Sequence, residues 1–379
     1  MDKVSIITTE DYSPYLLDSA VESHFQLLGL DSFLHPGSRV TLKPNLLMKR
    51  TPAEATTTHP EVVAAVVRVL KKRGITHITL ADSPGGLYTV GALTGIYKTC
   101  GMADMAQREG VQLNYDTGWQ EIATETQRVT KFNIINPVAQ ADLVINICKL
   151  KTHCMTGLSG GVKNLFGCVP GLQKPEFHYR FKNADEFSDM LIDLCETVKP
   201  AITFVDAVVS MEGDGPSSGN PIHTGLTLCA ANPYALDVVL CRLIRMEEKQ
   251  ALTVKASFER KLAPCFDDIE LVGDSEKINS VANFRMPATK SVDFNTRLPN
   301  WMQSAANFIT DRWFVPKPVI HRNQCIGCGK CAESCPAKTI ALHNRKAYIN
   351  YQNCIKCYCC HEMCPVKAIH VKRSKLLSS

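Results

Sequence analysis

Eight cysteines near the C-terminus form two copies of one spacing. Three thiolates at i, i+3 and i+6 can wrap one face of an iron–sulfur cubane on a tight loop. The fourth cysteine, held away by the next helical turn and a proline, reaches the neighbouring cubane. The spacing therefore predicts two [4Fe–4S] clusters. The two copies, which repeat after 29 residues, are Cys325-x2-Cys328-x2-Cys331-x3-Cys335-Pro336 and Cys354-x2-Cys357-x2-Cys360-x3-Cys364-Pro365.

The fourth cysteine of each copy is predicted to serve the cluster of the other copy, as in bacterial two-cluster ferredoxins. Zinc is the alternative, but it does not require a third cysteine followed by Cys-Pro, twice. Cys359 is not needed by the pattern, and we expect it to point away from the cluster unless it displaces Cys360. The predicted ligand sets are Cys325, Cys328, Cys331 and Cys364 for the first cluster, and Cys354, Cys357, Cys360 and Cys335 for the second.

Polar residues collect after four apolar runs in the upstream part of the chain. In an open parallel sheet, ligands bind outside the carboxyl ends of the strands, so these four loops are predicted to share one crevice. The loops are Lys43-Pro44-Asn45, Asp82 to Gly86, Lys149 to His153, and Asp206 with Glu212 to Gly215.

The predicted crevice has the residues to bind and convert a small anion. Asp82 or Asp206 would act as an acid or base. The glycine-rich segment 157–161 would let backbone N–H groups approach a phosphate or carboxylate. We assign anion binding and catalysis to Lys149, Lys151, His153 and Lys163. Binding of the anion or a cofactor is assigned to Lys43, Asn45, Gly160, Gly161 and Asn164.

Each of these residue types also has an ordinary structural explanation. Lysines beside strands are usually solvated, and an aspartate at a strand end usually caps the next turn. Cys154 and Cys168 flank the glycine-rich segment and are candidates for nucleophiles or extra ligands. Scattered cysteines, however, are mostly buried small hydrophobic residues.

The elements that position these residues alternate between strands and helices over residues 1–290. This order predicts an α/β domain with a mostly parallel sheet covered on both faces. One helix is predicted from His59 to Arg73, with Thr58 and Glu61 as a capping box, and another after Asn232. The apolar runs that predict strands are 4–8, 39–42, 76–81, 142–147, 202–207, 225–230 and 269–272.

A linker is predicted at 291–320, the cluster domain at 321–372 and a basic tail at 373–379. Residues 321–379 contain ten Lys or Arg but only two acidic residues, Glu333 and Glu362. This excess predicts a docking surface for an acidic electron donor such as a ferredoxin or flavodoxin. The alternative is a solubilising surface without a partner. Nucleic acid is not expected, because no aromatic stacking motif accompanies the charge.

Composition restricts the remaining possibilities. No apolar run reaches the roughly 18 residues that a membrane span requires, and no signal peptide is recognisable, so we expect a cytoplasmic protein in a reducing compartment. Neither a Gly-x-Gly-x-x-Gly after the first strand nor a Walker A sequence occurs. A flavin could still bind, since many flavin sites have no short sequence motif.

Several of these segments together resemble the iron–sulfur family catalogued as domain of unknown function 362. Members often carry the same two-cluster tail, so the resemblance implies the architecture more than the chemistry. Residues 58–86 are also similar to the N-terminal domain of nickel-dependent lactate racemases, a fold analogy only. The segments that carry the family resemblance are Lys43-Pro44-Asn45, Thr58 to Glu61, Asp82 to Gly85, Lys149 to His153, Gly160 to Asn164, and Asp206.

Two functions follow from this organisation. In the first, the protein is a ferredoxin-dependent reductase that passes low-potential electrons to a small anionic substrate, directly or through a flavin. In the second, it is an electron-transfer or accessory protein whose large domain binds a ligand without chemistry. A non-redox enzyme with a structural ferredoxin tail is a third interpretation.

Overall fold

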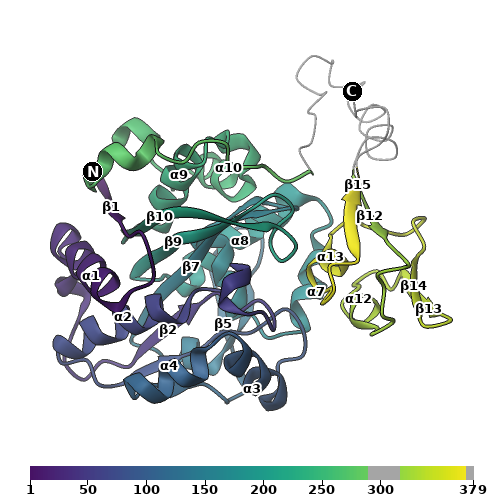
Figure 1. Ribbon diagram of the computed structural model, residues 1–379, viewed down its shortest axis with the longest axis horizontal. Helices are drawn as coiled ribbons and strands as arrows, with labels where there is room; N and C mark the ends of the chain where they lie inside the picture. Colours follow the sequence, from purple (N-terminus) through teal and green to yellow (C-terminus); the bar gives the residue numbers. More distant parts are fainter. Residues whose placement is uncertain (289–315, 373–379) are drawn as a thin grey trace.

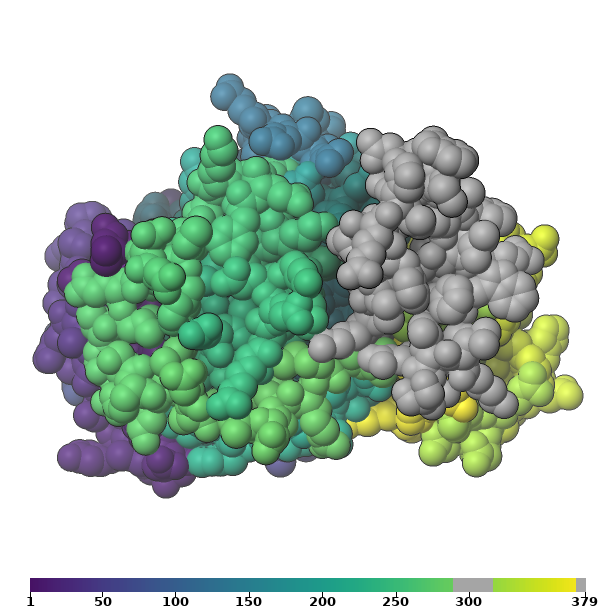
Figure 2. Space-filling view, turned by 90° about the horizontal axis from the view of Figure 1, so that it is seen from above, coloured from purple at the N-terminus to yellow at the C-terminus, as the bar shows by residue number. Residues whose placement is uncertain are grey.

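The computed structural model describes residues 1–288 and 316–372. Most of the predicted linker and the whole predicted basic tail lie outside these ranges. The cluster domain begins with a strand, β12 (Lys317–Ile320), inside the last part of the predicted linker. It lies at the opposite end of the molecule from the N-terminus (Figures 1 and 2).

The α/β domain is built on a nine-stranded sheet with the order β11-β1-β10-β9-β7-β2-β3-β4, and β8 pairs with β7. Strands β4, β3, β2, β7 and β9 run parallel to their neighbours in that part of the sheet, whereas β10 is antiparallel to β9 and β1. The prediction of a mostly parallel sheet is therefore confirmed. The strands are β1 (Asp2–Thr8), β2 (Val40–Pro44), β3 (Ile78–Leu80), β4 (Gln112–Leu113), β7 (Leu143–His153), β8 (Gly157–Ser159), β9 (Ile202–Glu212), β10 (Asn220–Ala230) and β11 (Ile269–Gly273).

Helices cover both faces of the sheet, because side chains alternate along each buried strand. Phe204 packs into a core formed with α1 (Pro14–Leu28) and α2 (Pro60–Lys72), whereas Val205 packs into a core with α9 (Pro233–Leu243). The remaining elements of this domain are α3 (Val90–Thr99), α4 (Met102–Glu109), β5 (Trp119–Ala123), β6 (Lys131–Ile135), α5 (Asn136–Ala139), α6 (Gly161–Asn164), α7 (Gln173–Arg180), α8 (Ala184–Val198) and α10 (Leu252–Glu259).

Helix α2 forms where it was predicted, but its N-terminal cap differs. His59 is the N-cap residue, and its Nδ1 accepts a hydrogen bond from Glu61 N at 3.2 Å. Thr58 instead accepts from Asn45 N and donates to Ile147 O, both at 2.8 Å. The predicted Thr58–Glu61 capping box is therefore wrong, because the threonine hydroxyl ties the exit of β2 to β7.

Strands β7 and β9 extend well beyond their predicted ends. Lys149, Lys151 and His153 alternate with Cys148, Leu150 and Thr152, and this period of two continues β7 to its end at His153. Asp206 likewise lies within β9. These side chains are thus placed by strands and not by loops, and the alternation decides which face each occupies.

The cluster domain consists of two related halves. Its antiparallel pairs are β12 with β15 (Ile369–Lys372), and β13 (Ile340–His343) with β14 (Lys346–Ile349). Its short helices are α12 (Lys330–Glu333) and α13 (Cys359–Glu362). No helix within the described ranges is long and apolar enough to cross a membrane.

Candidate functional site

The predicted cluster ligands gather in the two predicted groups. One small cavity is lined by all four thiols of the first set, Cys325, Cys328, Cys331 and Cys364. Burial, followed by the charges of the other three thiols, raises the pKa of Cys331 to about 11. Around Cys360, burial together with the nearby thiols of Cys357, Cys354, Cys331 and Cys335 raises the pKa of the thiol.

The donor chemistry at both sites fits an iron–sulfur cluster. The two halves make the same backbone contact: Thr339 N donates to Cys335 Sγ at 3.3 Å, and Ala368 N donates to Cys364 Sγ at 3.1 Å. Such N–H···S bonds stabilise ligating thiolates and tune cluster potential. Within the described ranges, no group of three or more His, Cys, Asp or Glu is arranged to hold a single metal ion.

Helix α13, which lies within the second cysteine run, docks on the carboxyl ends of β7 and β9. His153 Nε2 lies 3.3 Å from Glu362 Oε1, and His361 Nε2 lies 3.1 Å from Asp214 O. Ser217 Oγ donates to Glu362 O at 2.8 Å. The second cluster site is therefore seated at the edge of the sheet where the substrate crevice was predicted.

His153 contributes to this interface. Its Nδ1 accepts from the backbone N–H groups of Met155 at 3.1 Å and Thr156 at 3.3 Å, so the ring proton is on Nε2. Burial lowers the pKa of His153, which keeps the ring neutral. The structure thus places His153 in the contact between the two domains, and its predicted contact with substrate has no support in this geometry.

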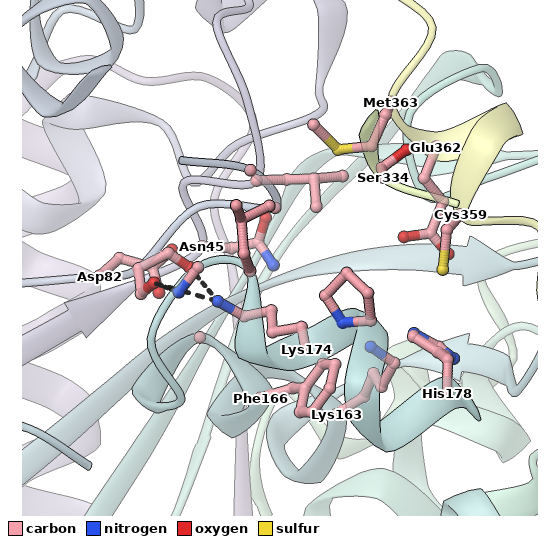
Figure 3. A pocket seen from close by; sticks show the side chains of 18 of the residues that line it. Asn45, Asp82, Lys163, Phe166, Lys174, His178, Ser334, Cys359, Glu362 and Met363 are labelled. Carbon is pink, nitrogen blue, oxygen red and sulfur yellow. Dashed lines mark hydrogen bonds between the residues drawn. The ribbon is translucent and has the colours of Figure 1, made fainter. Parts of the chain in front are cut away.

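A cavity of about 90 Å³ lies between the two domains (Figure 3). The cluster domain contributes Ser334, Cys359, Glu362 and Met363 to its wall. Cys359 lines the cavity, as Figure 3 shows. From the α/β domain, five of the predicted site residues line it: Lys43, Asn45, Asp82, Lys163 and Asn164.

Lys43 and Asp82 form a buried ion pair in the cavity wall, with Nζ and Oδ1 2.8 Å apart. Lys43 also donates to Pro44 O at 2.9 Å, and Asp82 Oδ2 accepts from Leu46 N at 2.6 Å. These contacts fix both side chains at the ends of β2 and β3. The pair adds polarity to the wall but little net charge.

Gly167 allows this pair to form, because a Cβ atom there would lie 1.9 Å from Asp82 Oδ1 and 2.6 Å from Lys43 Nζ. We expect Gly167→Ala to lower the free energy of unfolding by roughly 2–4 kcal/mol, since the clash displaces a buried ion pair. Urea unfolding at neutral pH measures this loss. Gly91→Ala is the matched control, since a Cβ at that helical position meets nothing within 4 Å. Equal stability of the two variants would contradict the prediction.

Lys163 is the cation best placed to meet a ligand. Its Nζ lies 4.8 Å from the centroid of the Phe166 ring, and no hydrogen bond or ion pair engages it among the described residues. Burial lowers the pKa of Lys163, while the charge of Glu362 across the cavity opposes that effect. Lys163 thus presents a buried amino group to the cavity.

Two further cavity residues, Lys174 and His178, were missed by sequence reasoning. Lys174 donates to the carbonyl oxygens of Ser83 and Val169 at 2.9 and 2.7 Å, and burial lowers its pKa to about 7. His178 stacks on Phe187 with ring centroids 4.1 Å apart, and its buried Nδ1 has no hydrogen-bond partner. Both lie on the short helix α7 and not at a strand end, so the pattern used to find the crevice does not reach them.

Lys149 and Asp206 do not line the cavity. They form a separate ion pair of 2.8 Å, with both side chains at most 1% exposed. Tyr12 bridges them, because its hydroxyl accepts from Lys149 Nζ at 2.9 Å and donates to Asp206 Oδ1 at 3.0 Å. The prediction that all four strand ends share one crevice is therefore wrong: Lys149 and Asp206 bond to each other and to Tyr12, and Asp206 Oδ2 also accepts from His59 N at 2.8 Å.

Replacing Asp206 by asparagine should destabilise the fold by about 3–5 kcal/mol, because Lys149 would keep a buried charge without its carboxylate. Denaturant unfolding measures the change. The double variant Lys149→Met/Asp206→Leu should recover part of the loss, since it removes both charges. Asp142→Asn is the control, since the Arg39–Asp142 pair is 64% and 45% exposed and should contribute at most about 1 kcal/mol. A loss no larger than the control's would contradict a structural role.

Lys151 lies behind the cavity wall. It donates to Asn45 Oδ1 at 3.0 Å and Thr56 O at 2.7 Å, and burial lowers its pKa to about 7. Asn45 in turn donates to Asn164 Oδ1 at 2.8 Å, and Asn164 donates to Asn146 Oδ1 at 2.7 Å. This chain of amides holds Asn45 and Asn164 in the cavity wall, so Lys151 acts on the cavity through other residues.

The backbone N–H groups of the glycine-rich segment are bonded to a carboxylate of the protein itself, that of Asp237. Gly161 N and Val162 N donate to the Asp237 carboxylate at 2.6 and 3.2 Å, and a Cβ at Gly160 would lie 2.1 Å from Asp237 Oδ1. Burial raises the pKa of Asp237 to about 7. The predicted binding of a substrate anion by Gly160 and Gly161 is therefore not supported, because a protein carboxylate occupies these N–H groups.

Cys154 and Cys168 are both buried, and burial raises the pKa of each thiol, to about 12 for Cys168. Cys168 packs in the core beside α8, and Cys154 Sγ lies 3.8 Å from His361 Nε2. A buried thiol with a raised pKa is a poor nucleophile. The geometry favours the structural interpretation for both.

Comparison with known proteins agrees with this architecture. A model described as a 4Fe-4S dicluster domain matches residues 317–365, which defines an iron–sulfur protein and favours iron–sulfur clusters over zinc. A second model, described as domain of unknown function (DUF362), matches residues 40–242, more than half of the chain. The protein belongs to the DUF362 family.

A relative and a solved structure add detail. The chain is 30% identical over 319 residues to a thylakoid-associated protein of Synechocystis sp., covering 83% of this chain and 97% of that one. The lactate racemase apoprotein from Thermoanaerobacterium thermosaccharolyticum matches at 13% identity with a TM-score of 0.39. That match covers 64% of this chain and 57% of the racemase chain.

Proposed function

We propose that this protein is an iron–sulfur reductase that delivers electrons to a small anion bound in the cavity between its two domains. The position of the cavity carries the proposal. Lys163 lies on one wall, and the other wall is formed by Cys359, Glu362 and Met363 (Figure 3). Cys359 is adjacent in sequence to Cys360, a predicted ligand of the second cluster, so an anion in the cavity would lie beside the second cluster site.

Different residues of the cavity would bind and orient the anion. Lys163 would pair with the anion, and the amides of Asn45 and Asn164, held by their hydrogen-bond chain, would orient it. When bound, the two [4Fe–4S] clusters supply single electrons at low potential. Pockets for drug-sized ligands measure roughly 300–1,000 Å³. The cavity of about 90 Å³ therefore favours an anion of a few heavy atoms reduced without an intervening flavin.

The proposal is tested with protein purified and reduced without oxygen. Nitrite, sulfite and pyruvate serve as probe anions, and recovery of the visible absorbance reports re-oxidation. Saturable re-oxidation by at least one probe, abolished when Lys163 loses its charge, is the expected result. If none of the anions gives saturable kinetics, the protein is better described as an electron-transfer protein whose large domain binds without chemistry.

Binding of the anion should also depend on pH. Lys174 has a pKa of about 7, lowered by burial, so its positive charge is present below pH 7 and lost above it. We expect the affinity for a probe anion to fall by roughly tenfold between pH 6 and pH 8, equivalent to about 1.4 kcal/mol of charge interaction. Calorimetric titration of the oxidised protein with nitrite measures this. Lys174→Met should flatten the profile, and a dependence that survives in this variant would assign it to another group.

A further inference from the structure

The two cluster sites differ in their access to solvent. Helix α13 packs against the α/β domain, whereas α12 and the β13–β14 hairpin lie on the far side of the cluster domain (Figure 1). Of the eight predicted ligands, Cys328 of the first set is the exposed one. The second site faces the cavity, so the first site is the one that an external protein can approach closely.

Apolar side chains surround the first cluster site at the surface. Ile326 is 58% exposed, Leu342 43% and Val366 41%, and all three line the same pocket as the four ligands of the first set. Exposed aliphatic residues gathered at one redox site form the kind of apolar centre found in transient protein interfaces. Electron-transfer complexes bury little area, usually below about 1,200 Å², so such a complex does not require a large apolar surface.

Basic residues border this apolar centre. Lys330 begins α12 next to the ligand loop, Lys346 Nζ donates to Cys325 O at 2.6 Å, and Lys367 follows Val366. Arg345 lies at the turn of the hairpin, where its carbonyl oxygen would be 2.2 Å from a Cβ at Gly327. Residues 316–372 contain nine Lys or Arg but only Glu333 and Glu362 as acidic residues, and Glu362 faces the cavity.

We propose that this face, formed by Ile326, Leu342 and Val366 and bordered by Lys330, Arg345, Lys346 and Lys367, is the docking site of an acidic one-electron carrier protein. The positive border complements an acidic partner and accelerates encounter, while the apolar centre brings the two redox sites together. One electron passes from the reduced carrier to the oxidised protein, and no atom is transferred. The face is remote from the cavity, so this inference stands apart from the identity of the anion.

The experiment uses the complete protein with both clusters and a reduced acidic [2Fe–2S] ferredoxin as the probe. Stopped-flow absorbance at low ionic strength gives the rate of electron transfer, and calorimetry with the oxidised ferredoxin gives the Kd. We expect Lys330→Glu/Arg345→Glu and, separately, Ile326→Glu to slow the reaction and weaken binding at least tenfold. The rate for the unsubstituted protein should fall steeply with salt, and the double variant should lose most of that dependence.

Two controls separate docking from damage to the protein. Methyl viologen radical cation, which needs no protein interface, should reduce the variants at least as fast as the unsubstituted protein. Lys72→Glu, an exposed lysine at the end of α2, should leave the reaction with ferredoxin unchanged. If the double variant and Ile326→Glu behave like Lys72→Glu, the docking face is refuted. No probe anion is present in these measurements, so this outcome leaves the proposed reductase function untouched.

Discussion

Replacement of Lys163 by methionine is expected to slow re-oxidation of the reduced protein by a probe anion at least 100-fold. Methionine keeps an apolar stem and removes the ammonium group, whose nitrogen lies 4.8 Å from the centroid of the Phe166 ring. Hydrogen bonds to charged groups contribute about 1.5–3 kcal/mol, and the low-dielectric cavity places this interaction toward the upper end of that range. About 2.7 kcal/mol corresponds to the 100-fold effect.

The comparison that isolates the charge is Lys163→Arg. Arginine keeps the positive charge, and we expect it to retain activity within about tenfold, because only the geometry of the contact changes. Iron content and the visible spectrum should be unchanged in both variants, since Lys163 is not a predicted ligand. Lys98→Met, at an exposed position of α3, controls for general loss of positive charge. Equal rates of re-oxidation for Lys163→Met and Lys98→Met would show that Lys163 does not bind the anion.

The order of elements and the presence of an iron–sulfur domain could be predicted from sequence because both depend on local patterns. Cysteine spacing is dictated by the geometry of a cubane, and apolar runs mark buried strands whatever surrounds them. The end of β7 could not be predicted in the same way, since Lys149 and Lys151 are polar residues that follow an apolar run and were therefore predicted to lie in a loop. They lie inside β7 because each is paired by a partner distant in sequence, Asp206 for one and Asn45 for the other.

The cavity itself could not be predicted, because it exists only where two domains meet. His153 and Glu362 are far apart in sequence, and no periodicity links them. Lys174 and His178 reach the cavity from α7, which follows no strand of the sheet. The sequence marks which residues can do chemistry, while long-range packing decides which of them share a site.

The exchange of ligands between the two halves of the cluster domain gives the second large prediction. Cys335→Ala should remove the second cluster and leave the first, although Cys335 follows the first run in sequence. Iron should fall from about eight to about four per chain. The structure supports this exchange, because Cys364 lines one cavity with Cys325, Cys328 and Cys331 of the first run, and Cys335 does not line it.

Pairs of substitutions reveal which cluster is lost. Cys335→Ala/Cys354→Ala removes two ligands of one predicted set and should still retain about four irons. Cys335→Ala/Cys325→Ala removes one ligand from each set and should retain almost none. The opposite pattern would show that each run holds its own cluster. Cys359→Ala, at the cysteine that faces the cavity, should keep about eight irons, and loss of iron there would instead make Cys359 a ligand.

The single variant Cys335→Ala also tests whether electrons reach the cavity through the second cluster. With only the first cluster present, Cys335→Ala should still accept electrons from a reduced acidic ferredoxin, because the exposed face around Ile326 is intact. Its re-oxidation by a probe anion should become nearly undetectable, since the site next to Cys359 and Glu362 is empty of its cluster. Reduction without re-oxidation would assign entry of electrons to the first cluster site and their exit to the second. Unchanged re-oxidation would mean that the anion does not bind between the domains.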